Sequence, residues 1–353
     1  MNLFPLVRPW LHALDPEVAH GLTLRALEMG MVTAQGRYDD PVLAVDLFGS
    51  RLPHPVGLAA GFDKNARVYA RMFGQGFAFV EVGGVTPRPQ AGNPRPRVFR
   101  LPDDGAVINR MGFPNDGANV IAARMRRAGR VEGIVGMNLA SNADSEDPAE
   151  DFVTLVRRFA PVAHYLVLDI SCPNTQNGQL FLEPKRLAEM LARVNAVRYD
   201  GHRVPLWAKL SPDTDSVHLQ ALVTTLLEAH IDGIIVSNTT KERPSLQSGA
   251  REQQGGLSGR PLFGPSTRLL AQVRLLTEGT IPLIGVGGIA SGVDAYEKIC
   301  AGASAVQLYT ALIYAGTELV THIKHDLAAL VRRDGFTALS QAVGSKAEAA
   351  SRR

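Results

Sequence analysis

Short, continuously apolar runs recur along the chain, and each is followed by a polar or glycine-rich turn and a stretch of helical periodicity. Continuous apolarity is typical of parallel strands that are covered on both faces. The helical stretches, such as 184–197 and 216–230, place their apolar residues on one face. The eight runs that we expect to form strands are 56–60, 77–83, 134–139, 165–171, 205–210, 233–238, 282–287 and 305–310.

This alternation predicts an α/β fold, a (β/α)8 TIM barrel within residues 41–340. An open, doubly wound sheet is the alternative that the same pattern allows. Two insertions interrupt the repeat. Residues 97–110 are expected to form a hairpin that turns at Asp104 and Gly105, and residues 240–265 to form a loop over the site.

The first 40 residues lie outside the repeat. Apolar residues recur at helical spacing from Phe4 onward, and Asp15 followed by Pro16 is typical of the start of a second helix. Residues 1–40 are therefore expected to form a helical hairpin. Its apolar face allows two interpretations, a cap packed on the bottom of the barrel or an anchor on a membrane surface.

Composition narrows the classes of function. The 353 residues carry a net charge of only +3 without a clustered basic stripe, which argues against nucleic-acid binding. Cys172 and Cys300 are too few for a disulfide framework or a zinc site, so we expect a reducing compartment and no metal. No apolar run is long enough to span a membrane, and no signal-peptide layout is present. The polar tail, residues 341–353, is expected to be disordered.

Polar side chains and small residues, mainly glycines, stand where the predicted strands end, and in a barrel these ends share one rim. A purely structural barrel has no need of such residues, so we expect the active site there. From the first strand to the eighth they are Ala60, Gly61 and Lys64; Gly83 and Gly84; Asn138; Asp169, Cys172 and Asn174; Lys209; Ser237, Asn238 and Thr239; Gly285, Gly287 and Gly288; and Tyr309 and Thr310.

The stretch GVGGIASG, residues 285–292, is the clearest single site. Its glycines let backbone N–H groups approach an anion, and Ser291 with Asp294 resembles a capping box for the next helix. A phosphate is therefore expected here, with a tight turn alone as the alternative. The dinucleotide pattern GxGxxA also fits, but no acid ends the next strand to hold a ribose.

Two lysines are expected to meet anions. Lys209 ends a buried strand, where an unpaired ammonium is costly, so a phosphate-bearing cofactor that gains negative charge on reduction suits it. Lys64 follows a glycine turn and is placed to hold a substrate carboxylate.

The run NRMGFPN, residues 109–115, combines polar donors with an apolar ring and suits a small planar ligand. For Lys209 the alternative is a lysine that snorkels to an exposed edge, and for residues 109–115 it is an ordinary turn.

Longer motifs carry a resemblance to a known family. They are LDPEVAH, GLAAGFDKNA, TPRPQAGNPRPRVFRL, INRMGF, CPNT, SNTT, GGLSGRPL, IGVGGIASG and GASAVQLYTAL. With them the chain resembles the dihydroorotate dehydrogenases, in particular the membrane-associated branch that uses quinones. The resemblance implies FMN as cofactor, oxidation of dihydroorotate to orotate, and a quinone that reoxidises the flavin. It also implies a peripheral location on the cytoplasmic side of a membrane, with the N-terminal hairpin on the membrane surface.

The resemblance assigns roles by position. Cys172 falls on the catalytic base, which takes the C5 proton while a hydride leaves C6 for the flavin. It implies FMN contacts for Ala60, Gly61, Asn138, Asp169, Lys209, Ser237, Gly259, Gly285, Gly287, Gly288, Tyr309 and Thr310. It implies substrate contacts for Lys64, Asn109, Arg110, Met111, Gly112, Phe113, Asn174, Asn238 and Thr239.

The chain departs from the family within the site. Cys172 stands where the quinone-using branch has serine, Asp169 where the family has asparagine, and Gly84 where it has a threonine that contacts FMN. The stretches 138–144 and 175–181 also differ. An ionised Asp169 repels anionic dihydroorotate, whereas a protonated one can donate a hydrogen bond. A paralogue that oxidises another cyclic amide, and a flavin-binding protein without turnover, are therefore the alternative functions.

Overall fold

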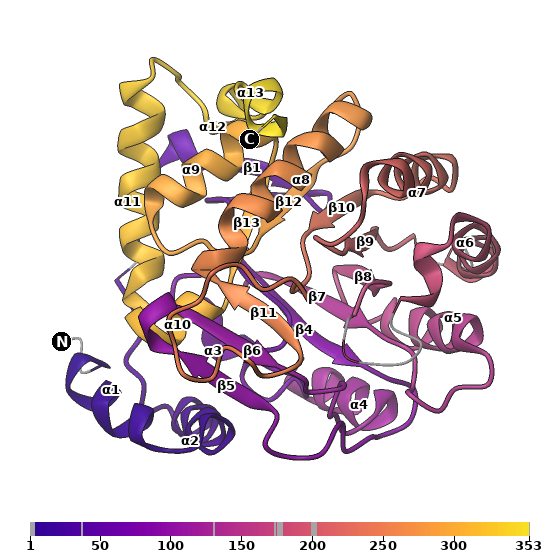
Figure 1. The fold of residues 1–353 in the computed structure, drawn as a ribbon, viewed down its shortest axis with the longest axis horizontal. Coiled ribbons are helices and arrows are strands. Elements are labelled where there is room, and N and C mark those ends of the chain that lie inside the picture. The colour runs from indigo at the N-terminus through magenta and orange to yellow at the C-terminus, as the bar shows by residue number, and fades with distance from the viewer. Residues whose placement is uncertain are drawn as a thin grey trace.

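A closed barrel of eight parallel strands, wrapped by helices, forms the body of the molecule (Figure 1). This computed structural model describes residues 4–36, 38–129, 131–172, 174, 179–198 and 203–352. Around the barrel the strands run β10, β12, β13, β3, β4, β7, β8 and β9. In chain order they are β3 (Val56–Leu58), β4 (Phe79–Val85), β7 (Ile134–Leu139), β8 (Tyr165–Asp169), β9 (Leu206–Leu210), β10 (Gly233–Val236), β12 (Leu283–Val286) and β13 (Ala305–Leu308). The predicted TIM barrel is confirmed.

Helices cover the outer face of the barrel. They are α3 (Tyr69–Phe73), α4 (Ala118–Ala128), α5 (Pro148–Phe159), α6 (Pro184–Arg198), α7 (Ser216–Glu228), α8 (Phe263–Leu276), α9 (Gly292–Ala301) and α11 (Glu318–Arg333). A short helix, α10 (Thr310–Ala315), lies instead at the C-terminal rim, in contact with α1 (Phe4–Ala13), β6 (Ala106–Asn109) and β11 (Gly256–Gly259). Every residue of β7, β8 and β9 is buried, because one side of each strand faces the barrel interior and the other faces helices. Aspartates begin two of the helices, since the Asp147 and Asp215 carboxylates accept N–H groups in the first turns of α5 and α7.

An aromatic cluster fills the N-terminal end of the barrel. Phe48 lies at the turn of a small hairpin formed by β1 (Val45–Leu47) and β2 (Ser50–Leu52), and it stacks on Tyr165 with ring centroids 3.8 Å apart. Phe79 and Trp207 lie beside it, at 5.4 and 5.1 Å. Each of these three strand rings lies over a glycine, where a Cβ atom would come within 2.1–2.4 Å of the ring; the glycines are Gly57, Gly136 and Gly233. The filled floor leaves the C-terminal end of the barrel for a ligand.

A separate three-stranded sheet stands above the barrel. The predicted hairpin is confirmed as β5 (Val98–Leu101) and β6 (Ala106–Asn109), which pair antiparallel and turn at Gly105, whose φ is +56°. The third strand, β11 (Gly256–Gly259), pairs with β6. We expected residues 240–265 to be a loop, and this is wrong for their last part, because the backbone groups of 256–259 find partners on a strand remote in sequence.

Two helices form the N-terminal extension, as predicted. They are α1 (Phe4–Ala13) and α2 (Pro16–Glu28). The Asp15 carboxylate accepts the N–H groups of Glu17 and Val18 at 2.9 and 3.1 Å and so begins α2. In the part of the chain that the structure describes, no helix has both the length and the apolar character needed to cross a bilayer.

Arginines of the separate sheet fix this extension beside the C-terminal rim. The Arg100 guanidinium donates to the carbonyls of Leu11, His12 and Leu14, which end α1. On α2, Glu17 accepts hydrogen bonds from the buried Arg97. The interpretation of the extension as a cap on the barrel bottom is therefore wrong. That end is closed by the β1–β2 hairpin instead.

The C-terminal tail is ordered against the barrel helices, contrary to the expectation of disorder. It contains α12 (Leu339–Ala342) and α13 (Ala347–Ser351), and α13 packs on α8. Ala347 and Ala350 are buried because their spacing places both on one helical face. The Lys346 N–H also donates to the Cys300 carbonyl at 2.8 Å. The buried residues of α13 are alanines rather than large apolar residues, so hydrophobic periodicity did not reveal its packed face in the sequence.

Candidate active site

A cavity of about 1110 Å³ opens at the C-terminal ends of the barrel strands and continues outward between α2 and α10. Its size exceeds that of most single-ligand pockets, so it has room for more than one bound group. Nearly all of the predicted site residues line it. They are Ala60, Gly61, Lys64, Asn109, Met111, Gly112, Phe113, Asn138, Asp169, Cys172, Asn174, Lys209, Ser237, Asn238, Thr239, Gly259, Gly287, Gly288, Tyr309 and Thr310.

Two predicted residues lie elsewhere. The Arg110 guanidinium donates to Gln253, to the Gln254 carbonyl and to the Pro96 carbonyl, so it joins two loops outside the cavity. Gly285 packs outward, where a Cβ atom would lie 3.2 Å from Ala303 and 3.3 Å from Lys298. The two corrections have different causes. Arg110 follows the end of β6, where contacts with the neighbouring loops decide the direction of its side chain. Gly285 lies inside β12, where its neighbours are Ala303 and Lys298 rather than the cavity.

Asp169, Lys209 and Asn238 form the polar centre of the cavity. Asp169 and Lys209 are register partners on β8 and β9, and both are buried. The Asn238 amide donates to the Asp169 carboxylate at 2.9 Å. Among the described residues, the Lys209 ammonium has no hydrogen-bond or ion-pair acceptor, although it faces the cavity. An anionic ligand group would satisfy it, as the sequence predicted.

Burial raises the pKa of Asp169 to about 6, and the charge of Lys209 opposes this rise. Cys172, three residues further along, is also buried and lines the same cavity. The carboxyl group therefore changes from a hydrogen-bond donor to a negative charge near pH 6, and it is mainly ionised at neutral pH. Pro173 and residues 175–178, which include most of the divergent turn after this strand, lie outside the described residues.

Lys64 sits at the edge of the cavity and is held by its own loop. Its ammonium donates to the Gly61 carbonyl at 2.5 Å, and burial lowers the pKa of Lys64 to about 8. The neighbouring Asp63 is structural, because its buried carboxylate accepts four backbone N–H groups of residues 65–69. Below pH 8 the loop therefore presents a positive charge suited to a carboxylate ligand.

A loop that carries Asn109 and Phe113 forms one wall. The Asn174 amide approaches the Asn109 side-chain oxygen at 3.4 Å, which brings two predicted substrate contacts together. Phe113 packs over Gly84, where a Cβ atom would lie 2.5 Å from the Phe113 ring. The glycine that replaces the family's threonine thus makes room for this ring. In the divergent stretch 138–144, Asn142 has a structural role, because its side chain is hydrogen-bonded to backbone and side-chain groups of residues 88–90.

A buried carboxylate that sequence reasoning missed organises the cavity floor. Glu81 accepts the amide N–H groups of Asn138 and Gln307 at 2.9 and 2.8 Å. A carboxylate can only accept, so both amides must turn their oxygens away from it. Both oxygens are buried without a partner among the described residues, and both side chains line the cavity. The sequence did contain a signal for this network, since Glu81 and Gln307 are polar residues inside strands that are otherwise apolar.

The glycine loop after β12 forms the phosphate-sized end. Gly287 and Gly288 have φ of +103° and +78°, and in the described chain their N–H groups have no acceptor. The next helix is capped nearly as predicted, since Ser291 accepts from the Asp294 N–H and the Asp294 carboxylate accepts from Ala290. Free N–H groups, orphan amide oxygens and an unpaired lysine in one cavity together fit a planar ring that bears an anionic tail.

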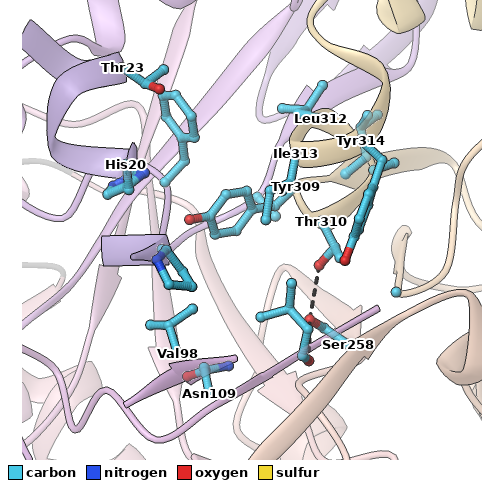
Figure 2. Close-up of a pocket in the computed structure, with 18 of the residues that line it drawn as sticks. His20, Thr23, Val98, Asn109, Ser258, Tyr309, Thr310, Leu312, Ile313 and Tyr314 are labelled. Carbon is cyan, nitrogen blue, oxygen red and sulfur yellow. Dashed lines mark hydrogen bonds between the residues drawn. The ribbon is translucent and has the colours of Figure 1, made fainter. Parts of the chain in front are cut away.

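The outer half of the cavity is mainly apolar and runs toward the N-terminal hairpin. Figure 2 shows His20 and Thr23 on one side and Leu312, Ile313 and Tyr314 on the other, with Tyr309 between them. The Thr310 hydroxyl donates to Ser258 at 2.9 Å. Burial lowers the pKa of His20 to about 3, so its ring is neutral and leaves the passage uncharged.

Comparisons with known proteins agree with this geometry. A sequence model described as dihydroorotate dehydrogenase matches residues 42–331. A protein named dihydroorotate dehydrogenase (quinone) from Azorhizobium caulinodans is 46% identical, with 98% of this chain and 99% of that protein covered. The protein of the same name from Parvibaculum lavamentivorans is 48% identical at the same coverage.

Solved structures give the same result. A crystal structure of DHODH from Eimeria tenella, in complex with ferulenol, superposes with a TM-score of 0.91 at 35% identity. The match covers 94% of this chain and 96% of that chain. The ligand-free enzyme from the same organism has a TM-score of 0.90. The family model spans most of the chain and the named relatives cover 98% of it, so the chain belongs to the dihydroorotate dehydrogenase family.

Proposed function

We propose that this chain oxidises dihydroorotate to orotate with FMN as its cofactor and passes the electrons to a quinone. The observation that carries the proposal is one continuous cavity, which joins the polar rim of the barrel to an apolar passage at the N-terminal hairpin. A polar substrate and an apolar electron acceptor can then reach the two halves of one site. The oxidation belongs to pyrimidine biosynthesis.

Cys172 acts as the base. It takes the proton from C5 of dihydroorotate, and a hydride leaves C6, so that a C5–C6 double bond forms. When bound, FMN would supply the acceptor for this hydride and the two electrons that reduce the quinone. Lys64 holds the substrate carboxylate, while Asn109, Asn174 and Asn238 orient the ring; Met111, Gly112, Phe113 and Thr239 complete this proposed contact set.

The proposed cofactor contacts use the remaining lining residues. Lys209 would balance the negative charge that the flavin ring gains on reduction, and the Asn138 oxygen, fixed by Glu81, would accept a hydrogen bond from the ring. The loop at Gly287 and Gly288 would hold the phosphate with its backbone N–H groups. Ala60, Gly61, Asp169, Ser237, Gly259, Tyr309 and Thr310 line the space between these ends.

Residues 1–40 serve as the docking and quinone-entry unit, and residues 41–340 as the FMN-binding barrel. The extension exposes an unusual number of large apolar side chains, including Trp10, whose exposed fraction is 77%. Exposed apolar patches mark surfaces that meet protein or lipid, and indole rings favour the lipid–water boundary. This surface and the apolar passage behind it support a peripheral position on a membrane, and the family resemblance implies its cytoplasmic side.

One observation favours a second candidate. Asp169 contributes a carboxylate to the cavity, and a carboxylate repels an anionic substrate but accepts the N–H groups of a neutral cyclic amide. Oxidation of a neutral cyclic amide by the same cavity is therefore the alternative function.

Flavin bleaching tests the reaction. The purified protein should be yellow with FMN and should bleach rapidly on addition of dihydroorotate without oxygen. A yellow protein that fails to bleach with dihydroorotate, yet bleaches with dihydrouracil as a neutral cyclic amide, supports the second candidate. A protein that cannot be loaded with FMN contradicts both.

Vesicle binding tests the docking surface. Wild-type protein should sediment with vesicles of phosphatidylethanolamine and phosphatidylglycerol, and Trp10→Ser should lose several-fold in affinity. Val217→Ser, which removes an equally exposed apolar side chain from α7, is the matched control. Equal binding by both variants would contradict the docking role of the hairpin.

A further inference from the structure

Lys298, on α9, is a buried cation that the reaction does not use. Its exposed fraction is 0%, and among the described residues no carboxylate lies within ion-pair distance. Its one hydrogen-bond acceptor is the Ser266 hydroxyl, at 2.6 Å. Burial lowers the pKa of Lys298 to about 7, because a charge without a counter-ion is poorly tolerated in the interior. A buried ammonium of this kind needs an anion nearby.

The side chain runs directly beneath the glycine loop. A Cβ atom on Gly285 would lie 3.3 Å from Lys298 Cβ, so the glycine leaves space for the lysine stem. Farther along, the ammonium meets Ser266, whose hydroxyl lies 3.3 Å from the Gly287 carbonyl. It also lies 5.2 Å from the centroid of the Phe263 ring, at the first residue of α8.

The opposite face of the same loop belongs to the active-site cavity. Gly287 and Gly288 line it with unpaired N–H groups, and the beginning of α8 packs against Gly288. Helix N-termini and free N–H groups attract anions, but a phosphomonoester carries close to two negative charges at neutral pH. Within the described chain, the only ionisable cationic group that we find immediately behind this loop is the Lys298 ammonium.

We propose that Lys298 is a positioning residue that stabilises the phosphate of the bound flavin from behind the glycine loop. The lysine does not touch the ligand. Its charge acts through Ser266 and the loop backbone, in surroundings of low dielectric where a charge one layer away still has a large effect. The inference rests on the proposed FMN cofactor, and it gives Gly285 a packing role in place of ligand contact.

The phosphate itself supplies the test, because riboflavin has the same ring without it. The affinities of the flavin-free full-length protein for FMN and riboflavin can be measured by flavin fluorescence. In Lys298→Met, FMN affinity should fall about tenfold, equivalent to about 1.4 kcal/mol, while riboflavin affinity stays within about twofold. Inorganic phosphate should raise the melting temperature of flavin-free wild-type protein more than that of the variant.

Lys324→Met is the matched control. Lys324 is equally buried on α11, but it lies beside Gly76, which precedes β4 at the other end of the barrel. Its removal should leave the ratio of the two affinities unchanged. If Lys298→Met does not fold, as judged by circular dichroism, Lys298→Gln keeps a polar group of similar length and should lower the ratio in the same direction.

The possible failures differ from one another. If Lys298→Met loses equal affinity for FMN and riboflavin, or loses none for either, the ratio of the two affinities is unchanged. That result would overturn the inference and leave the proposed cofactor intact. Absence of FMN binding by the wild-type protein would overturn the proposed cofactor together with the inference.

Discussion

Asp169 and Lys209 are register neighbours on β8 and β9, and both side chains enter the cavity that holds Cys172. A lysine and a carboxyl group of raised pKa, placed side by side, make the charge of the site depend on pH. Below a pH of about 6 the pair carries a net positive charge, and above it the two charges cancel. The net charge that an anionic ligand meets in the cavity therefore changes within the physiological pH range.

Orotate binding should weaken as pH rises. Asp169 is mainly protonated at about pH 5 and mainly ionised at about pH 7.5, whereas the orotate carboxylate stays ionised throughout. We expect the orotate Kd, measured from the shift in flavin absorbance, to rise about tenfold over this range. Asp169→Asn should remove the dependence and bind orotate at pH 7.5 about as tightly as the wild type does at pH 5. A pH dependence that persists in Asp169→Asn would show that another group causes it.

Removal of the proposed base should separate binding from chemistry. In Cys172→Ala the flavin should stay bound, while anaerobic bleaching by dihydroorotate slows by orders of magnitude, because no group remains to take the C5 proton. Cys172→Ser restores a group that can transfer a proton and should bleach faster than the alanine variant. Stopped-flow absorbance provides the measurement, and wild-type rates in Cys172→Ala would remove this residue from the reaction.

At the level of elements, the N-terminal hairpin depends on the sheet beside it. Arg100 of β5 donates to three carbonyls at the end of α1, and Arg97 binds Glu17 on α2. The ends of helices have carbonyls without internal partners, so a guanidinium there acts as a cap. The two arginines thereby hold one wall of the apolar passage in place.

Loss of the Arg100 cap should loosen α1 without unfolding the barrel. In Arg100→Met, amide hydrogen exchange in residues 4–14 should become at least about tenfold faster, because local opening costs less once the carbonyls lose their donor. Flavin reduction by dihydroorotate should stay normal, whereas the KM for quinone should rise. Arg51→Met, which breaks an exposed ion pair with Asp46, is the control and should change neither measurement. Unaltered exchange in residues 4–14 would contradict the capping role.

Across the whole molecule, the two ends of the barrel are built for different tasks. The N-terminal end is filled by Phe48 and three strand rings, while the C-terminal end holds amides, a lysine and N–H groups that have no partner among the described residues. Dense packing at one end stabilises the fold. Polar groups without protein partners at the other end lower stability unless a ligand satisfies them.

Truncation of Phe48 should therefore affect stability but not chemistry. Phe48→Ala removes the ring that stacks on Tyr165, and we expect a loss of about 2–4 kcal/mol in the free energy of unfolding. Urea denaturation of the FMN-loaded protein measures the loss, and the rate of flavin bleaching should match the wild type. A slower rate at unchanged stability would indicate that the barrel floor communicates with the site.

The sequence alone determined the elements and the rim. Parallel strands in this fold must be apolar on both sides, so eight runs were visible as strands, and Asp15 and Gly105 identified a helix start and a hairpin turn. The residues at the strand ends were predictable as a group, because the C-terminal ends of barrel strands always meet on one rim. These features follow from local periodicity and from rules of topology.

Only the tertiary structure decided which side chains meet. Glu81 and Gln307 are separated by 226 residues, and Lys298 lies behind the glycine loop only because α9 packs there. The strand pairing of residues 256–259, the burial of the alanines in α13 and the outward direction of Arg110 were likewise invisible in the sequence. Each depends on contacts between segments distant in the chain, and hydrophobic periodicity carries no information about such contacts.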